Sequence, residues 1–436
     1  MSHRSLNFRT ITAGLVASLA AVVGFAAFAS ASHAQSTAGS YFQSQLKAKG
    51  SKKAAEKATM AAMKGDKGFY GFKLKAKDIP AKNGTLIWAK KGSKNRPEAG
   101  RTDVVLYSSR SVFNKKIPVS GTVMVPKGKA PKGGWPVISW AHGTTGLADQ
   151  CAPSRRLGDT AYYGSESGEL VANWLKSGYA VLSTDYEGLG TPGVHPYLVG
   201  DSEGRGVLDI VRAARELNPK IGKQVVLTGH SQGGQAILFA AKLATTSWGK
   251  GSNYLGTVSY APASNLVPQA NLLTNNPGFD GQWGLSALAL AIVRGMTIGN
   301  PAIDAEPLMT AAGLALYPKT DTVCLDELTV LAQNAGLDPG ELFKPGWQST
   351  ADGARMIEAL NAANPAVKVG APVMIPQGLS DGTVQPTFTG QLITQLEGLN
   401  NPSLIDYVTY PGATHSSVLA ASRADVDNFV KALLNP

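Results

Sequence analysis

Residues 229–234 read Gly229-His230-Ser231-Gln232-Gly233-Gly234, a Gly-x-Ser-x-Gly pattern between two predicted elements. The apolar, β-branched run at 224–228 predicts a strand before the motif, and a helical pattern follows over 235–247. Small neighbours let the chain turn sharply here, and a serine on such a turn has a strained backbone. This context favours a serine nucleophile over a glycine-rich turn that only reverses the chain or binds an anion.

The motif lies within an alternation of predicted strands and helices. The run at 135–141 is continuous and apolar apart from Ser139, which is typical of a strand buried on both faces of a sheet. Three earlier segments, at 85–89, 103–107 and 119–125, predict a meander of strands. The later strands are predicted at 179–185, 224–228, 255–260, 371–376 and 404–410, with helices at 169–176, 204–217, 235–247 and 417–434. Repeated strand–helix units predict an α/β fold with a mainly parallel sheet.

The alternation stops between residues 262 and 370. Helical patterns replace it, at 285–296, 306–316, 325–335 and 350–363. An insertion of this kind within a sheet protein is most simply a helical cap over the strand ends. Its Leu, Ala and Ile side chains suit an apolar pocket for an acyl chain, although most of them must form the core of the cap itself.

A serine hydroxyl needs a general base to become a nucleophile, and the base needs a carboxylate to orient it. His415 follows the motif, in the loop after the strand at 404–410. The remaining histidines are His3, His33, His142 and His195, which precede the motif, and His230, whose side chain we expect to point elsewhere on the turn. Asp381, in the loop after 371–376, fits the carboxylate, although Asp-Gly is also a common turn dipeptide. The order Ser231, Asp381, His415 is that of α/β hydrolases.

Acyl transfer also needs donors for the oxyanion of the tetrahedral intermediate. The backbone N–H of Gln232, directly after the nucleophile, is one candidate. The other is expected in the loop after the strand at 135–141, which reads His142-Gly143-Thr144-Thr145-Gly146. Spacing alone does not choose between Thr144 and Thr145.

Three further carboxylates, Asp185, Glu187 and Asp201, lie near predicted strand ends. A metal site would need a cluster of His, Asp or Glu at ligand spacing, and the sequence has none around them. Structural roles are therefore favoured, and no metal is predicted.

The first residues have the pattern of an export signal. Arg4 and Arg9 precede an apolar run from 11 to 29, and Ser32-His33-Ala34 has small residues where a signal peptidase cleaves. We predict a cleaved signal peptide at 1–34 and a secreted or periplasmic protein; the alternative is an uncleaved membrane anchor. The two cysteines, Cys151 and Cys324, then predict one disulfide in an oxidising compartment, or else two separate thiols.

The net charge of +11 is unevenly distributed. Residues 35–133 hold 22 Lys and Arg against 5 Asp and Glu, a net of +17, whereas residues 134–436 hold 17 against 25, a net of −8. A basic N-terminal third could contact an anionic surface or membrane, but a solvated basic flank is the simpler interpretation. No nucleic-acid-binding motif accompanies it, so no nucleic-acid partner is predicted.

Together these residues resemble the secretory lipase family of α/β hydrolases. The resemblance runs from about residue 119 to the C-terminus and rests on the Ser231 motif, the loop at 142–146, Cys151-Ala152-Pro153-Ser154, Asp185-Tyr186-Glu187-Gly188, Asp381 and His415. It implies nucleophile Ser231, acid Asp381, base His415, a helical cap and a disulfide between Cys151 and Cys324. It also implies hydrolysis of carboxylic esters, including acylglycerols, without a cofactor. The loop at 142–146 departs from the family loop, in which an aspartate serves the oxyanion.

The sequence thus predicts an exported serine esterase or lipase that acts on small-molecule or lipid esters. Its predicted parts are the signal at 1–34, a basic arm and first strand region at 35–100, a hydrolase core at 101–261 and 371–436, and the cap at 262–370. Two alternatives stay open. A peptidase or amidase would use the same triad, and a non-catalytic surface-binding protein would keep the fold and use the basic arm.

Overall fold

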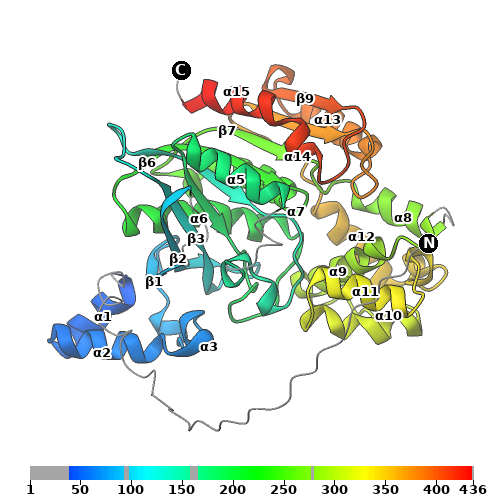
Figure 1. Cartoon of the computed structure of the whole chain (residues 1–436). Helices are drawn as coiled ribbons and strands as arrows, with labels where there is room; N and C mark the ends of the chain where they lie inside the picture. Colours follow the sequence, from blue (N-terminus) through cyan, green and yellow to red (C-terminus); the bar gives the residue numbers. More distant parts are fainter. Residues whose placement is uncertain (1–38, 93–97, 158–164, 276–278, 435–436) are drawn as a thin grey trace, which may run out of the picture.

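A nine-stranded sheet forms the centre of the computed structural model, which describes residues 39–92, 98–157, 165–275 and 279–434 (Figure 1). The strand order is β1-β2-β3-β5-β4-β6-β7-β8-β9. Strands β1 to β3 pair antiparallel with their neighbours, and β3 pairs antiparallel with β5. All pairs from β5 to β9 are parallel. The predicted α/β-hydrolase architecture, a mainly parallel sheet flanked by helices, is confirmed.

The strands lie close to their predicted positions and are mostly longer. Their bounds are β1 Leu86–Lys91, β2 Ala99–Arg110, β3 Lys116–Pro126, β4 Trp135–Ala141, β5 Ala180–Thr184, β6 Ile221–His230, β7 Asn253–Tyr260, β8 Val373–Gly378 and β9 Ile405–Tyr410. Successive residues of the central strands enter opposite cores: Val137 packs on one side of the sheet and Ile138 on the other. Burial of both faces explains why β4 is apolar apart from Ser139, whose hydroxyl donates to the Val207 carbonyl at 2.9 Å.

Helices cover both faces of this sheet. On one face lie α6 (Gly200–Leu217), α7 (Gln232–Ala244) and α13 (Pro386–Leu399). On the other lie α5 (Glu166–Lys176) and α15 (Arg423–Leu434), together with the short α14 (Val418–Ala421). The single helix predicted at 417–434 is therefore two helices. Helix α7 begins at Gln232, three residues earlier than predicted, because the two glycines of the motif form its first turn.

Between β7 and β8 the chain is helical, in the range for which the sequence predicts a cap. The helices are α8 (Leu266–Asn275), α9 (Trp283–Gly299), α10 (Ala311–Leu316), α11 (Leu325–Asn334) and α12 (Ala351–Ala362). They gather beside the sheet in Figure 1 and have a hydrophobic core of their own, which includes Leu290, Met296 and Leu328. Helix α8 has no counterpart among the predicted elements.

The basic N-terminal region is folded against the sheet. Its helices are α1 (Ser40–Lys49), α2 (Lys52–Ala62) and α3 (Gly65–Phe69). The Tyr41 ring lies 5.3 Å from that of Trp88 on β1, and the Trp88 indole N–H donates to the Phe69 carbonyl at 2.8 Å. Residues 40–69 thus cover one end of the sheet. The predicted signal peptide at 1–34 lies outside the described residues. Over the described ranges, no helix is both long enough and apolar enough to cross a membrane.

Candidate active site

Ser231 lies on the turn between β6 and α7 with a backbone conformation that side chains rarely adopt, at φ 59° and ψ −116°. Such a conformation costs about 1–3 kcal/mol and persists only where the surroundings enforce it. The Ser231 N–H donates to the Tyr260 carbonyl on β7 at 2.9 Å, and the Ser231 carbonyl accepts from the Gln235 N–H at 3.1 Å. Contacts with the neighbouring strand β7 and with α7 therefore hold Ser231 in this conformation.

The glycines around Ser231 have a steric reason. A Cβ on Gly229 would lie 2.3 Å from the Gly233 carbonyl oxygen, and a Cβ on Gly233 would lie 1.9 Å from the Ala141 carbonyl oxygen. Any side chain at either position would push α7 away from β4 and β6. The two glycines thus bring the first turn of the helix up against the sheet, as the motif predicts.

The structure brings Asp381 and His415 into contact. The Nδ1–H of His415 donates to Asp381 Oδ2 at 2.8 Å, and the Asp381 side chain is fully buried. Because Nδ1 carries this proton, the neutral imidazole has its lone pair on Nε2. Asp381 Oδ1 accepts the backbone N–H groups of Thr383 and Val384, both at 2.8 Å, so the carboxylate cannot rotate freely. Asp381 therefore forms the predicted turn and also orients the imidazole.

Ser231 and His415 share one cavity. It has a volume of about 800 Å³ and is also lined by Thr144, Thr145 and His230. The residues predicted as nucleophile, base and loop donors thus lie around one space, although they come from three separate segments of the chain.

The side chain of His230, expected to point elsewhere on the turn, lies in the same cavity and contacts His415. Its ring lies 4.5 Å from that of His415, and its Nε2–H donates to the His415 carbonyl at 2.8 Å. Burial, and then the neighbouring His415, lower the pKa of His230 to about 3. His230 therefore stays neutral beside the imidazole that must accept a proton. This contact joins the end of β6 to a loop 185 positions later, so it can be recognised only in the folded structure.

The pKa of His230 predicts how stability depends on pH. An unfolded histidine binds a proton near pH 6.5, about 3.5 pH units above folded His230. Protonation thus favours the unfolded chain, and the free energy of unfolding should fall below about pH 6.5, by up to about 1.4 kcal/mol per pH unit from this group. The variant His230→Gln keeps a donor for the His415 carbonyl but cannot titrate. Urea unfolding near pH 7 and near pH 4.5 should show a shallower loss for the variant; equal losses would contradict this account.

The predicted oxyanion loop after β4 passes close to the nucleophile. A Cβ on Gly143 would lie 3.7 Å from the Cβ of Ser231. The Thr144 hydroxyl is hydrogen-bonded to the Tyr197 hydroxyl at 2.6 Å, and the Thr145 carbonyl accepts the Leu325 N–H at 3.0 Å. Both threonines are thus fixed by contacts with other segments. Gln232 begins α7, and the first N–H groups of a helix have no partner within the helix.

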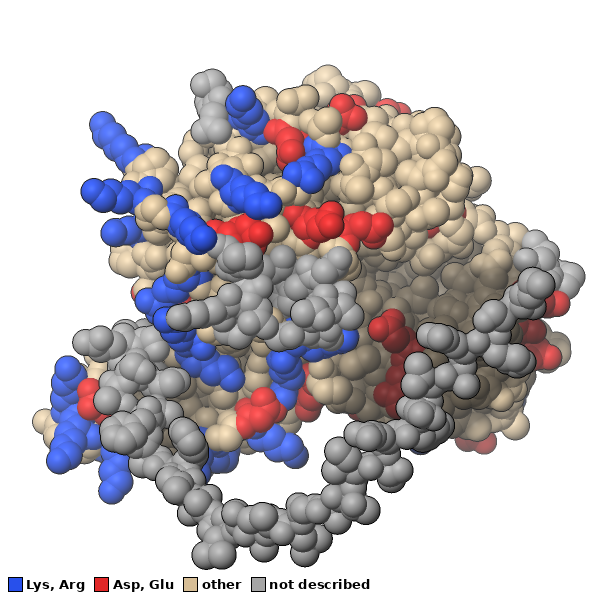
Figure 2. Space-filling view, in the orientation of Figure 1, with Lys and Arg blue, Asp and Glu red and all other residues tan. Residues whose placement is uncertain are grey.

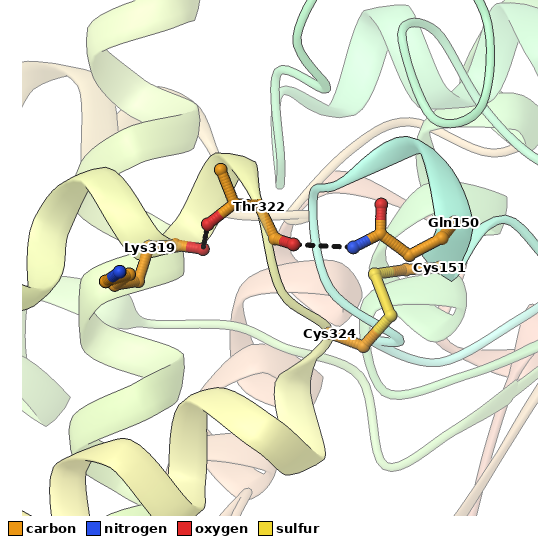
Figure 3. The surroundings of a disulfide bond; sticks show 5 residues. All are labelled: Gln150, Cys151, Lys319, Thr322 and Cys324. Atoms are coloured by element: carbon orange, nitrogen blue, oxygen red, sulfur yellow. Dashed lines mark hydrogen bonds between the residues drawn. A yellow bond between two sulfur atoms is a disulfide. The ribbon is translucent and has the colours of Figure 1, made fainter.

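A disulfide between Cys151 and Cys324 joins the segment after this loop to the helical segment (Figure 3). This confirms the disulfide and the pairing that the resemblance implies. The Gln150 side-chain amide donates to the Thr322 carbonyl at 2.6 Å beside it, and Gly146 pairs with Cys324 in an isolated β-bridge. The loop at 142–146 and the segment that follows it are therefore attached to the residues before α11 by hydrogen bonds and by a covalent bond.

The three other carboxylates have structural partners, as predicted. Asp185 accepts the Ser120 hydroxyl at 2.6 Å and the Ser154 N–H at 2.9 Å, and its burial raises its pKa to about 6. Glu187 accepts the Val112 N–H at 2.9 Å and the Ser202 hydroxyl. Asp201 forms a half-exposed ion pair with Lys242 at 3.1 Å.

A second, apolar cavity of about 90 Å³ begins at Ser231 and extends into the helical segment. Leu285 and Leu288 of α9 line both cavities, as Ser231 does. The remaining lining includes Leu266, Phe343 and Met356, which no sequence pattern distinguished from the core of the helical segment. An apolar chain attached to a group at Ser231 would fit here.

A comparison with protein families finds a match for part of the chain. The family model for "Secretory lipase" matches residues 163–291, which include Ser231 and end before Asp381 and His415. A comparison with curated proteins finds no match.

Solved structures share the fold. Candida antarctica lipase A in its closed state is 20% identical, with a TM-score of 0.66 over 81% of this chain and 83% of its own. The rice cell wall degrading esterase LipA from Xanthomonas oryzae, in a ligand-bound form, is 20% identical, with a TM-score of 0.65 over 81% and 99%. A hydrolase structure from Legionella pneumophila, described as putative, is 17% identical, with a TM-score of 0.65 over 79% and 97%. The family-model match, within a fold shared with these enzymes, confirms the resemblance to the secretory lipase family and supports the assignment of the chain as a carboxylic ester hydrolase.

Proposed function

We propose that the protein hydrolyses acyl esters through Ser231, His415 and Asp381. The observation that carries this proposal is the 2.8 Å hydrogen bond from His415 to buried Asp381, in a site whose cavity is shared by His415 and the strained Ser231. It leaves Nε2 of His415 as the free base on the cavity side of the imidazole. An orienting carboxylate, a base and a serine in this order are what acyl transfer requires.

The reaction then proceeds in two halves. The Ser231 hydroxyl attacks the ester carbonyl carbon while His415 Nε2 takes its proton, and the carbonyl oxygen becomes an oxyanion bound by the N–H of Gln232 and of Thr144 or Thr145. The tetrahedral intermediate releases the alcohol, which takes the proton from His415, and leaves an acyl-enzyme. His415 then deprotonates a water molecule, which attacks the acyl-enzyme; as the second tetrahedral intermediate collapses, His415 returns the proton to the Ser231 oxygen and the acid is released.

The two cavities suggest which part of the substrate lies where. The apolar cavity suits the acyl chain, and the larger cavity, lined by polar side chains such as Gln282 and Thr329, suits the alcohol. The apolar cavity is well below the ~300–1,000 Å³ typical of drug-sized ligands. We therefore propose short- to medium-chain acyl esters as substrates, with residues 262–370 acting as the cap that supplies the acyl pocket.

This proposal predicts the dependence on acyl length. On p-nitrophenyl esters from acetate to palmitate, kcat/KM should reach its maximum at a short or medium chain. The variant Leu288→Trp narrows the junction of the two cavities, and it should lower kcat/KM for octanoate by about tenfold or more, with a smaller loss for acetate. Leu399→Trp, at an exposed position on α13, is the matched control. Equal losses on acetate and octanoate would contradict the acyl pocket. Faster turnover of matched p-nitroanilides than of the esters would favour an amidase.

We also propose that the N-terminal helices contact an anionic lipid surface. Figure 2 shows Lys and Arg side chains along the side of the molecule that includes α1 and α2, and the lysines of α2 include exposed Lys52, Lys53 and Lys57. Met60, exposed to 44%, adds an apolar contact beside them. Each lysine near an anionic membrane contributes about 1 kcal/mol. Removing 35–68 would uncover Trp88, so charge reversal is the better experiment.

The triple variant Lys52→Glu, Lys53→Glu, Lys57→Glu should lower co-sedimentation with phosphatidylglycerol vesicles by about tenfold or more and leave binding to phosphatidylcholine unchanged. The control reverses Lys127, Lys129 and Lys132, which lie between β3 and β4. If both triple variants lowered vesicle binding equally, the lysines of α2 would have no specific role in lipid binding and would simply be exposed to solvent. Export through a cleaved signal at 1–34 is a separate proposal, tested by N-terminal sequencing of the exported protein.

A further inference from the structure

A buried polar cluster lies behind the proposed oxyanion site. Its side chains come from residues 186–203, which connect β5 to α6 and form the first turn of α6. Tyr186, His195 and Glu203 have no exposed surface, and Tyr197 is exposed to 3%. The reaction proposed above uses none of them. Buried polar groups are costly unless they are paired, so their arrangement is informative.

Two members of the cluster form hydrogen bonds with the side chain of Gln232. The Gln232 side-chain nitrogen lies 2.8 Å from Glu203 Oε1 and 2.8 Å from His195 Nε2. The His195 Nδ1 lies 2.8 Å from the Glu187 carbonyl oxygen, which can only accept, so Nδ1 carries the proton. The lone pair of His195 is then on Nε2. One Gln232 N–H donates to Glu203 Oε1 and the other to His195 Nε2, whereas Glu203 Oε2 is buried without a hydrogen-bond partner among the described residues.

The same cluster contacts the loop that should supply the second donor. The Tyr197 hydroxyl is bonded to the Thr144 hydroxyl at 2.6 Å, and the Tyr186 hydroxyl donates to the His142 carbonyl at 2.9 Å. The His195 ring stacks on Tyr186 at 5.6 Å with an interplanar angle of 9°, and it lies 6.1 Å from the Tyr197 ring. His195 therefore lies between the two tyrosines that hold the loop and bonds directly to Gln232.

We propose that His195 is a positioning residue that sets the two oxyanion donors relative to each other. It does not touch the substrate. Its Nε2 fixes the side chain of Gln232, and its ring fixes the two tyrosines that hold the loop at 142–144. Donors act on a transition state only if they are placed before it forms, and a displacement of about 1 Å costs about 100-fold in rate. This inference rests on the proposed function and adds a residue that the triad does not contain.

Two variants of His195 test the proposal. His195→Phe keeps an aromatic ring but removes the acceptor, and it should lower kcat by about 10- to 100-fold with KM changed less than about threefold. His195→Gln supplies an amide oxygen as an acceptor for Gln232 and should recover most of this loss. The Ki of a trifluoromethyl ketone, which forms a tetrahedral oxyanion at the nucleophile, should rise in His195→Phe by the same factor as kcat/KM falls.

Tyr197→Phe is the second variant, because it removes only the hydroxyl that bonds Thr144 and keeps the ring. It should also lower kcat with KM nearly unchanged, and it decides the matter if His195→Phe does not fold. Tyr317→Phe is the matched control, since it removes an equivalent bond to Thr297, of 2.8 Å, within the helical segment. Folded variants with wild-type kcat and Ki would overturn the positioning role while leaving the esterase proposal intact. A wild-type protein inactive on every ester would overturn both.

Discussion

Replacing Ser231 by alanine is expected to lower kcat on p-nitrophenyl esters by about 10⁶-fold, the size of effect seen when a triad nucleophile is removed. The remaining groups cannot form an acyl-enzyme, so only transition-state binding by the oxyanion donors would contribute to rate. Stability should not decrease, because the methyl group fits where the hydroxymethyl group was. Steady-state kinetics on the preferred ester, with thermal unfolding of both proteins, measure the two quantities.

The matched control for this variant is Ser416→Ala. Ser416 lines the same cavity and follows His415 in the chain. This control should keep kcat within about threefold, since no step of the acyl-enzyme reaction uses the Ser416 hydroxyl. If Ser231→Ala kept more than about one hundredth of wild-type kcat, a different nucleophile or direct attack by water would have to replace the mechanism.

Replacing Asp381 by asparagine is expected to lower kcat by about 10⁴-fold. Asparagine can keep the two backbone N–H bonds to Thr383 and Val384 through its oxygen, but its amide would then donate to His415 Nδ1. The imidazole proton would move to Nε2, where a lone pair must accept the proton of Ser231. KM should change little, because Asp381 is buried below His415. Steady-state kinetics near pH 8 would show this as a loss confined to kcat.

Asp425→Asn is the comparison for that variant. Asp425 accepts the Tyr410 hydroxyl at 2.7 Å near the same loop but does not contact His415. It should leave kcat unchanged. If the Asp381→Asn enzyme kept more than about a tenth of wild-type kcat, the 2.8 Å hydrogen bond between His415 and Asp381 would have a structural role in the turn and no role in orienting a catalytic base.

The sequence predicts well where the signal is local. Strand β4 is recognisable because every residue from 135 to 141 except Ser139 is apolar, and Ser231 because glycines surround it between a strand and a helix. Asp381 and His415 are found because each follows a strand in the required order. Helix α8 was missed: it is only ten residues long, and Pro268 near its start is a residue that usually marks a turn or the end of a helix.

The second layer of the site could not be predicted from the sequence. His230 was judged by its place on the turn, yet its function depends on a carbonyl 185 residues away. The contacts of Gln232 with His195 and Glu203 join three segments, and nothing in the sequence near any of them marks the others. The same holds for Tyr197 and Thr144. Such contacts arise only when the sheet brings the ends of β4, β5 and β6 together.

The central claim is that Ser231 is the residue that is acylated during turnover. A fluorophosphonate, which reacts with activated serines, followed by peptide mass spectrometry tests it directly. The account predicts one adduct per chain on the peptide containing Gly229-His230-Ser231, loss of ester hydrolysis in step with labelling, and much slower labelling in His415→Ala. An adduct on another residue, or full hydrolysis by a protein that does not label, would contradict the account.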